Sequence, residues 1–330
     1  MRLLLALALC LAVTPVSAKT LYVDAATGSD ATSYAANGIG APWQTLGRAV
    51  WGSTNRAAPN ASEAATAGDI VRVATGTYDY AGTIGDRFTS VYDPANNGTS
   101  GNYIEFRCVG TCTLTAADTE SPVVGSGGNY IKWFADRSLG HSWSISACGE
   151  DIGGSDQCPA GTVAATPDTG AVVMVGTAVW IEGFVVTGYA GITYTDNWNA
   201  IRMEGCASCT VRNNTLSAIR KASGGNHNQS GITLYGVSNA LIEHNRIFDA
   251  GAGVFFKNTG SSSLQSGNIV RFNLISDVGE AIAYSLVSAG STGRNWIFQN
   301  IAYDVNHGVR ILDATDDWIF NNTFYNLGIA

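Results

Sequence analysis

The chain contains few charged residues, and it lacks a long apolar run after its first twenty positions. Charged residues make up 13% of the 330 positions, and 18 Lys and Arg stand against 26 Asp and Glu, which gives a net charge of −8. So few basic residues argue against nucleic acid, which requires a basic stripe. No later stretch approaches the roughly 18 uninterrupted apolar residues of a membrane-spanning helix. The sequence therefore predicts no nucleic-acid partner and no membrane span.

The amino end has the pattern of an export signal. Residues 1–18 combine Arg2, the apolar run LLLALALCLAV and a small-residue ending at Ala18. That run is too short to span a bilayer, so we expect a signal peptide over 1–18 and an extracellular or periplasmic mature domain over 19–330. The sequence leaves the oligomeric state open.

The cysteines are few and lie in close pairs along the chain. Six follow the expected signal peptide: Cys108, Cys112, Cys148, Cys158, Cys206 and Cys209. An even count in an exported chain indicates disulfides, and the grouping suggests three local loops. The CxxC pair Cys206 and Cys209 could instead be half a zinc site or a redox pair, although no second CxxC completes a metal site.

A repeat runs through the second half of the chain. Its copies, with spacings from 31 down to 22 residues, are CTVRNNTLSAI from Cys209, ALIEHNRIFDA from Ala240, NIVRFNLISDV from Asn268, NWIFQNIAYDV from Asn295 and DWIFNNTFYNL from Asp317. Repeats of this length are typical of solenoids. Each copy turns on an asparagine, at Asn214, Asn245, Asn273, Asn300 and Asn322. Because Asn tolerates left-handed backbone angles and can hydrogen-bond its neighbours, we expect an asparagine ladder.

A second strand type lies between these turns. Its copies are AIRMEG from Ala200, GITLYG from Gly231, GVFFKN from Gly253, AIAYSL from Ala281 and GVRILD from Gly308. Their period of two predicts strands with one buried face, and the absence of helices between them indicates parallel coils. This pattern resembles the right-handed parallel β-helix family, which includes many secreted polysaccharide lyases and hydrolases. The resemblance implies an all-β, single-stranded solenoid.

The resemblance extends to the amino end. Three segments are similar to the entry segments of secreted β-helix proteins: LYVDAATGSDA, APWQTLGRAV and AGDIVRVATGTY. Pro42 can open a short helix that places Trp43, Leu46 and Val50 on one face to cap the first coil. We expect the cap and first coil over 19–78, loop-rich coils over 79–178 and regular coils over 179–330. The chain stops directly after a repeat, so we expect it to be truncated there.

One predicted surface consists of stacked, alternating charges. Aligned repeats place equivalent positions about 4.8 Å apart. The column before the Asn turn contains Glu182, Arg212, Glu243, Arg271, Phe298 and Phe320. Alternating charge predicts a structural salt-bridge ladder. Trp296 and Trp318 form a second column, for which mutual stacking is favoured over binding of sugar rings.

The other predicted surface has no such alternation. Its outward columns are Arg202, Thr233, Phe255, Ala283 and Arg310, and Glu204, Tyr235, Lys257, Ser285 and Leu312; Asn199, Glu280 and His307 lie at its edge. Lys257 is one of only three lysines after Lys19. A lysine pressed between aromatic neighbours and backbone can have its pKa lowered enough to abstract a proton, as β-elimination beside a uronate carboxylate requires. The alternative is a solvated lysine paired with Glu204.

The family resemblance implies roles for these residues. In the lyases of this fold a lysine or arginine is the base, a second basic residue assists the leaving oxygen, and calcium often neutralises the uronate. By this resemblance the catalytic candidates are Lys257, Arg310, His307 and Tyr235, and the candidates for binding an acidic polysaccharide are Arg202, Glu204, Glu280 and Asn199. The only calcium candidates are the scattered Glu204, Glu280 and Asp277.

Two other functions stay open on this fold. A pectin hydrolase is disfavoured because its motifs are missing or out of order. The acidic group Asp313, Asp316 and Asp317 is more simply interpreted as a solvated turn or a stray cation site. A non-catalytic glycan-binding or adhesion module would use the same coils. The enzyme would be favoured if five side chains converged in one groove: Glu204, Tyr235, Lys257, Arg310 and His307.

Overall fold

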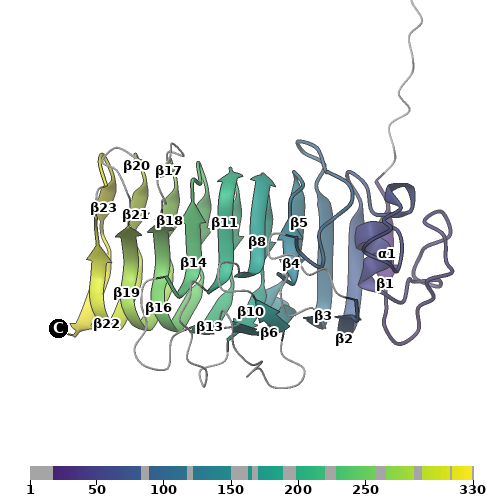
Figure 1. The fold of residues 1–330 in the computed structure, drawn as a ribbon, viewed down its shortest axis with the longest axis horizontal. Coiled ribbons are helices and arrows are strands. Elements are labelled where there is room, and N and C mark those ends of the chain that lie inside the picture. The colour runs from purple at the N-terminus through teal and green to yellow at the C-terminus, as the bar shows by residue number, and fades with distance from the viewer. Residues whose placement is uncertain are drawn as a thin grey trace, which may run out of the picture.

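The computed structural model describes residues 18–82, 89–116, 122–149, 163–165, 170–188, 198–219, 228–257, 265–285, 292–312 and 314–328. Three expected features lie outside the residues so described: most of the signal peptide, Asp313, and Cys158 of the third cysteine loop. Figure 1 shows the coils stacked along one axis from the helix α1 to the carboxyl-terminal strands. All pairings between the named strands of the described residues are parallel, as the repeats predict.

Three ladders of strands run along this axis. The first, whose outward side we call the short-strand face, contains β1 (Thr20–Val23), β2 (Ile70–Tyr80), β3 (Ile104–Ala116), β5 (Ile131–Ala135), β9 (Trp180–Glu182), β12 (Thr210–Arg212), β15 (Leu241–Glu243), β18 (Ile269–Arg271), β21 (Trp296–Phe298) and β23 (Trp318–Phe320). The second begins on the later parts of β2 and β3 and adds β6 (Ser142–Gly149), β10 (Phe184–Thr187), β13 (Thr215–Ile219), the first parts of β16 (Arg246–Lys257), β19 (Leu274–Ser285) and β22 (Ile301–Arg310), and β24 (Thr323–Leu327).

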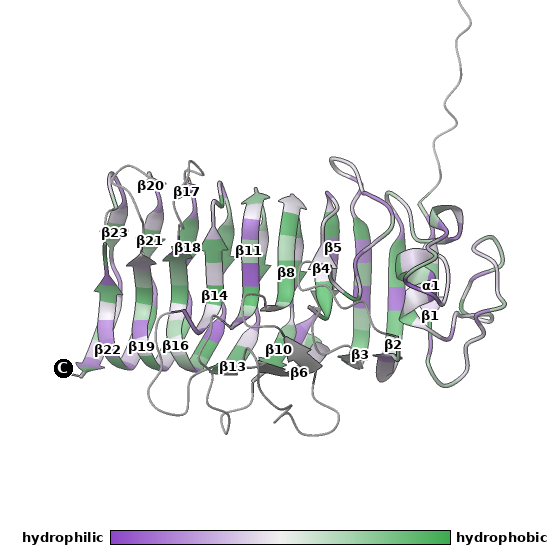
Figure 2. Cartoon of the chain, viewed as in Figure 1, coloured by the Kyte–Doolittle hydropathy of each residue, from purple (hydrophilic) through white to green (hydrophobic). Residues whose placement is uncertain are grey.

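The third ladder presents what we call the Lys257 face. It contains β4 (Val124–Ser126), β8 (Gly170–Thr177), β11 (Asn199–Ala207), β14 (Ser230–Tyr235) and the later parts of β16, β19 and β22. The remaining elements are α1 (Leu46–Trp51), two 3-10 turns (Ala61–Glu63 and Arg137–Leu139) and the short strands β7 (Val163–Ala165), β17 (Gln265–Ser266) and β20 (Thr292–Gly293). Figure 2 shows apolar and polar residues interspersed along the strands, as expected where one side of each strand is buried.

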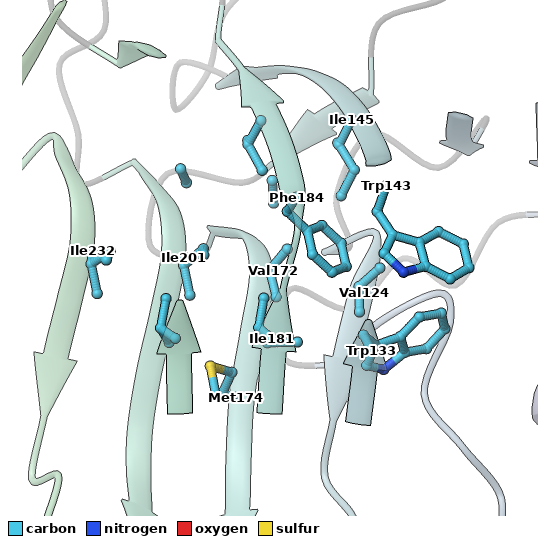
Figure 3. Packing of buried hydrophobic residues seen from close by; sticks show 14 of the residues in the cluster. Val124, Trp133, Trp143, Ile145, Val172, Met174, Ile181, Phe184, Ile201 and Ile232 are labelled. Carbon is cyan, nitrogen blue, oxygen red and sulfur yellow. The ribbon is translucent and has the colours of Figure 1, made fainter. Parts of the chain in front are cut away.

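The space between the ladders is filled by large apolar side chains (Figure 3). Trp133, Trp143 and Phe184 are fully buried and come from three different strands. The rings of Trp133 and Trp143 meet edge to face at 5.3 Å, and the rings of Trp143 and Phe184 stack at 6.1 Å. The core is therefore continuous across coils, and it holds the outward residues of neighbouring coils at fixed spacing.

The asparagine ladder is confirmed. Each ladder side chain donates to the next one at 2.9–3.0 Å, from Asn214 through Asn245, Asn273 and Asn300 to Asn322. One detail of the prediction is wrong. The left-handed corner is taken by the residue before each ladder asparagine, as at Asn213 with φ 55° and His244 with φ 55°. The ladder residue instead points inward, where its amide satisfies buried backbone groups such as Val211 O.

The predicted capping helix is present but starts later than expected. Trp43, Leu46 and Val50 are buried as predicted. However, α1 begins at Leu46, because Trp43 extends the edge of β1: its N–H donates to Tyr22 O at 2.9 Å, and its carbonyl accepts from Asp24 N at 2.8 Å. Pro42 therefore precedes an extended segment and does not open the helix.

Two of the three expected disulfide loops are present. Cys108 is bonded to Cys112, and Cys206 is bonded to Cys209. The zinc alternative for Cys206 and Cys209 is therefore not what this structure contains, since the two sulfurs are bonded to one another and buried. A disulfide is also the oxidised form of a redox pair, so that alternative stays a prediction. No helix in the described ranges has the length and apolar character needed to cross a membrane.

Candidate functional site

The charges on the short-strand face pair from coil to coil, as predicted. Arg212 lies 3.4 Å from Glu182 and 3.7 Å from Glu243, and Arg271 lies 2.8 Å from Glu243. Further along, Trp296 stacks on Trp318 with ring centroids 4.8 Å apart. These side chains satisfy one another, so regular stacking accounts for this part of the face.

The Lys257 face follows the predicted register. Arg202 aligns with Thr233 and Glu204 with Tyr235; the next coils add Phe255 beside Thr233 and Lys257 beside Tyr235. Phe255 departs from the expectation of an outward, exposed residue, because it is fully buried. It packs with Ala252 and Ala283 in a cluster separate from the main core, so this part of the face is covered.

Three consecutive coils bring cations and rings together at Tyr235. The Arg202 guanidinium lies 4.3 Å from the centroid of the Tyr235 ring, and Lys257 Nζ lies 5.6 Å from the same centroid. Lys257 Nζ also lies 5.9 Å from the Phe255 ring. Arg202 is 7% exposed, whereas Tyr235 and Lys257 are half-buried. This cluster therefore places two basic side chains around one aromatic ring.

Glu204 pairs with the arginine of its own strand. Arg202 Nε donates to Glu204 Oε2 at 3.0 Å. Among the pairs seen in the described chain, Glu204 contacts this guanidinium and not Lys257, which lies two coils away, or roughly 10 Å along the axis. Glu204 is therefore held by the arginine of its own strand.

A second polar group lies further along the same face. Glu280 on β19 aligns with His307 on β22, and Arg310 Nη1 donates to Glu280 Oε1 at 3.1 Å. Arg310 lies in the column of Phe255 and Ala283, two coils beyond Phe255. The predicted residues thus share one face over five successive coils, in two groups: Arg202, Tyr235 and Lys257 on three coils, and Glu280, His307 and Arg310 on the next two.

The calcium candidates are not brought together. Glu204 and Glu280 lie on coils three steps apart, and Asp277 is an exposed left-handed residue before Glu280. Nowhere in the described ranges do three or more His, Cys, Asp or Glu side chains gather in a way that could hold a metal ion. The calcium candidates therefore have no assembled site, and calcium dependence stays a prediction.

Two other predicted residues have structural roles. Asn199 is 1% exposed and donates its amide to Asn228 O at 2.9 Å and to Ser230 Oγ at 3.1 Å, so it does not lie on the accessible surface. Asp317 accepts from Asn295 N at 3.0 Å and from Asn295 Nδ2, which extends a second inner ladder. This role supports the interpretation of the Asp316 and Asp317 segment as a turn.

Sequence reasoning missed one residue that positions Lys257. Gln265 is fully buried, and its amide donates to Lys257 O at 2.7 Å and to Leu234 O at 3.1 Å. It therefore fixes the end of the strand that carries Lys257. No repeat pattern indicates this, because Gln265 lies in a segment whose length changes from coil to coil.

Comparisons with known proteins agree with this fold. Residues 170–329 match the family model described as a right handed beta helix region. Pectate lyase Pel9A aligns over 93% of this chain and 79% of its own, with 10% identity and a TM-score of 0.54. An alginate lyase from Paenibacillus sp. str. FPU-7 aligns over 79% and 90%, with 14% identity and a TM-score of 0.43. No curated protein matches the sequence.

At 10% identity the likeness to Pel9A concerns the fold alone. It agrees with the parallel ladders of this chain. The chain is a right-handed parallel β-helix protein with a pectate-lyase-like fold.

Proposed function

We propose that this protein binds an acidic polysaccharide along the Lys257 face and cleaves it by β-elimination, with Lys257 as the base. The observation that carries the proposal is the cluster at Tyr235, where Arg202 and Lys257 lie 4.3 Å and 5.6 Å from one ring. The fold shared with pectate lyase Pel9A is compatible with this chemistry but does not by itself assign it.

The reaction assigns a role to each group. Unprotonated Lys257 Nζ accepts the proton from the carbon beside the uronate carboxylate, the bond from the neighbouring carbon to the glycosidic oxygen breaks, and a carbon–carbon double bond forms. The Tyr235 hydroxyl donates a proton to the leaving oxygen. Arg202 attracts the carboxylate and stabilises the charge that develops on it. Arg310 and His307, roughly 10 Å along the axis, contact a neighbouring sugar of the chain.

The test is the absorbance of the unsaturated uronate product formed by the purified protein from pectate, alginate and glycosaminoglycans, with calcium or a chelator. Lys257→Met keeps most of the apolar stem but removes the amine, so product formation should fall by at least a hundredfold. Arg246→Met is the matched control, because Arg246 is an exposed cation 4.9 Å from the Phe248 ring on another ladder. Equal rates in the Lys257→Met variant and the parent protein would refute the proposal.

A non-catalytic glycan-binding module is the second candidate. It is favoured by the ion pairs Arg202–Glu204 and Arg310–Glu280, which neutralise much of the positive charge on the face. Retention of the folded protein on a polysaccharide gel, with no product from any member of the panel, would move the assignment to this candidate.

A further inference from the structure

A cavity of about 480 Å³ lies at the amino-terminal end of the short-strand face, where β1 and β2 are neighbours (Figure 1). Its volume falls within the roughly 300–1,000 Å³ typical of ligand pockets. The lining combines two charged side chains with apolar ones: Asp24, Arg72, Tyr22, Ile39, Pro42 and Val109. The Lys257 face belongs to another ladder, so this cavity is separate from it.

One wall of the cavity is a tight turn that hydrogen bonds hold against β1. Ala41 N donates to Gly38 O at 3.0 Å, which closes the turn around Ile39. Just before it, the buried Asn37 accepts from Tyr22 N at 2.8 Å and donates its amide to Tyr22 O at 3.0 Å. The turn and the strand are therefore fixed relative to each other, and a pre-formed wall lowers the entropy that a ligand loses on binding.

The apolar part of this wall is open to solvent. Ile39 is 80% exposed, and it lines the cavity together with Pro42 and the half-buried Tyr22. A single exposed apolar side chain is common on a protein surface and needs no explanation by itself. Here the apolar side chains surround two charged groups, and an apolar wall with a few polar groups is the usual lining of a small-molecule site.

The Asp24 carboxylate is fixed in place but retains the capacity to accept a further hydrogen bond. Its Oδ1 accepts from Ala26 N at 2.8 Å and from Thr27 N at 3.3 Å, and its Oδ2 accepts from the Thr27 hydroxyl at 2.6 Å. These contacts, first that of the Thr27 hydroxyl, lower the pKa of Asp24, so it is ionised at neutral pH. Each carboxylate oxygen can accept two hydrogen bonds, which leaves Oδ2 able to accept one from a ligand.

Arg72 provides the donors on the other side. It is exposed, and its guanidinium carries five N–H donors and no acceptor. None of the ion pairs found in the described ranges involves Arg72. The cavity therefore presents one acceptor-only group and one donor-only group, and their charges cancel.

This combination favours an uncharged ligand with several hydroxyl groups. An anion that is attracted by Arg72 is repelled by Asp24, whereas a hydroxyl group can donate to the carboxylate and accept from the guanidinium. Sugar rings combine such hydroxyls with C–H faces that pack on aromatic and apolar side chains. A zwitterion also matches both charges, but ion pairs to an exposed arginine contribute little, and it leaves the apolar wall uncovered.

We propose that this cavity is a second saccharide-binding site, which takes a residue of an uncharged sugar chain. Asp24 accepts from one hydroxyl, Arg72 donates to another, and Tyr22 and Ile39 pack against the C–H face of the ring. The site does not depend on the proposed cleavage at Lys257.

The experiment is calorimetric titration of the protein with uncharged trisaccharides of xylose, glucose, galactose and mannose, and with a galacturonate trisaccharide and dialanine for comparison. At least one uncharged trisaccharide should bind more tightly than the galacturonate trisaccharide and dialanine. Ile39→Ser and Arg72→Gln should each weaken its binding about tenfold, the effect of losing one apolar contact or one hydrogen bond to a charged group. Both side chains are exposed, so neither substitution should disturb the fold.

Matched controls separate this site from general effects. Leu139→Ser replaces another strongly exposed apolar residue, at 68% exposure, and Arg246→Gln replaces another exposed arginine. Both should leave the affinity unchanged, and so should Lys257→Met. Binding that is lost in Lys257→Met would place the sugar on the other face and overturn the inference.

Three further results would overturn it. They are no binding of any uncharged trisaccharide, unchanged affinity in either Ile39→Ser or Arg72→Gln, and tighter binding of the galacturonate trisaccharide or of dialanine than of every uncharged probe. The affinity is measured without any product formation, so a failure of the proposed β-elimination leaves this test intact. Conversely, cleavage lost in Lys257→Met with no binding at the cavity would refute this site alone.

Discussion

The short-strand face and the Lys257 face are built on the same coils, yet their charges are arranged differently. On the short-strand face beyond β9, each arginine contacts the glutamate of a neighbouring coil, as Arg212 does with Glu182 and Glu243. On the Lys257 face, Arg202 pairs within its own strand, and the next coils bring Tyr235 and Lys257 in place of a carboxylate. The alternating pairs on the short-strand face follow from the stacking of the coils, so a structural role explains them. The arrangement on the Lys257 face has no such explanation, which makes it the better place to look for chemistry.

The interior asparagine ladder supports both faces, so the largest loss of stability is expected when one of its residues is replaced. Asn245→Ala leaves the buried Asn214 N and Asn214 Nδ2 without their acceptor. Each unsatisfied group costs about 1–3 kcal/mol, so the free energy of unfolding should fall by about 3–5 kcal/mol. Urea unfolding measures it. A loss below about 1 kcal/mol, or a loss of one face's function only, would contradict a shared support.

Removing a cation from the Lys257 face should lower cleavage, whereas removing one from the short-strand face should not. Arg202→Gln deletes the charge 4.3 Å from the Tyr235 ring, so kcat/KM for uronate cleavage should fall ten- to a hundredfold, or about 1.4–2.8 kcal/mol. Arg271→Gln removes a similar arginine from a glutamate pair on the short-strand face and is the matched control. Parallel losses of cleavage in both variants would indicate a general loss of stability and not a role at the site.

The short-strand face should respond in stability and not in cleavage. Glu243 is 5% exposed and contacts both Arg212 and Arg271. Because these partners are partly solvated, Glu243→Gln should cost about 1–2 kcal/mol of unfolding free energy, between the values for exposed and buried pairs. Cleavage per folded molecule should stay unchanged. A loss of cleavage without a loss of stability would show that this face also takes part in the reaction.

The repeats predicted most of the architecture because coil stacking is a local rule. Asn214 and its equivalents occur at a recognisable position in each repeat, so the ladder and the register of the outward columns could be derived from alignment alone. The start of α1 could not. Pro42 and Trp43 are compatible with a helix by themselves, and only the pairing of Trp43 with β1 decides against it.

The sites were harder to predict, because they depend on side-chain contacts between coils. Alignment placed Tyr235 beside Lys257, but it could not show that Glu204 turns to Arg202 or that Phe255 is covered. A hollow on the short-strand face, lined in part by Glu105, Lys132 and Trp180, was missed for another reason. Residues 79–178 lack a regular period, so the neighbours Glu105 and Trp180, 75 positions apart in the sequence, give no common signal.

The smallest effect concerns a carboxylate that lies on neither outward face. Burial raises the pKa of Asp93 above its ordinary value of 3.8, although the Gly127 N–H, which donates to Asp93 Oδ1 at 3.0 Å, and Arg56 act in the opposite direction. Because the folded chain then holds this proton more tightly than the unfolded chain, stability falls as the pH rises from about 3.8 through the folded pKa. Asp93→Asn keeps an acceptor for Gly127 and cannot ionise. It should match the parent in unfolding free energy near pH 3.5 and exceed it by up to about 1 kcal/mol at pH 7.

Asp24→Asn should show the opposite sign, because hydrogen bonds lower the pKa of Asp24 and stabilise its ionised form. Thermal unfolding of both variants across this pH range tests the pair. A gain for Asp93→Asn that persists at low pH would mean that packing, and not the charge, sets the stability at this position. The difference between the buried Asp93 and the paired carboxylates of the short-strand face would then not be electrostatic.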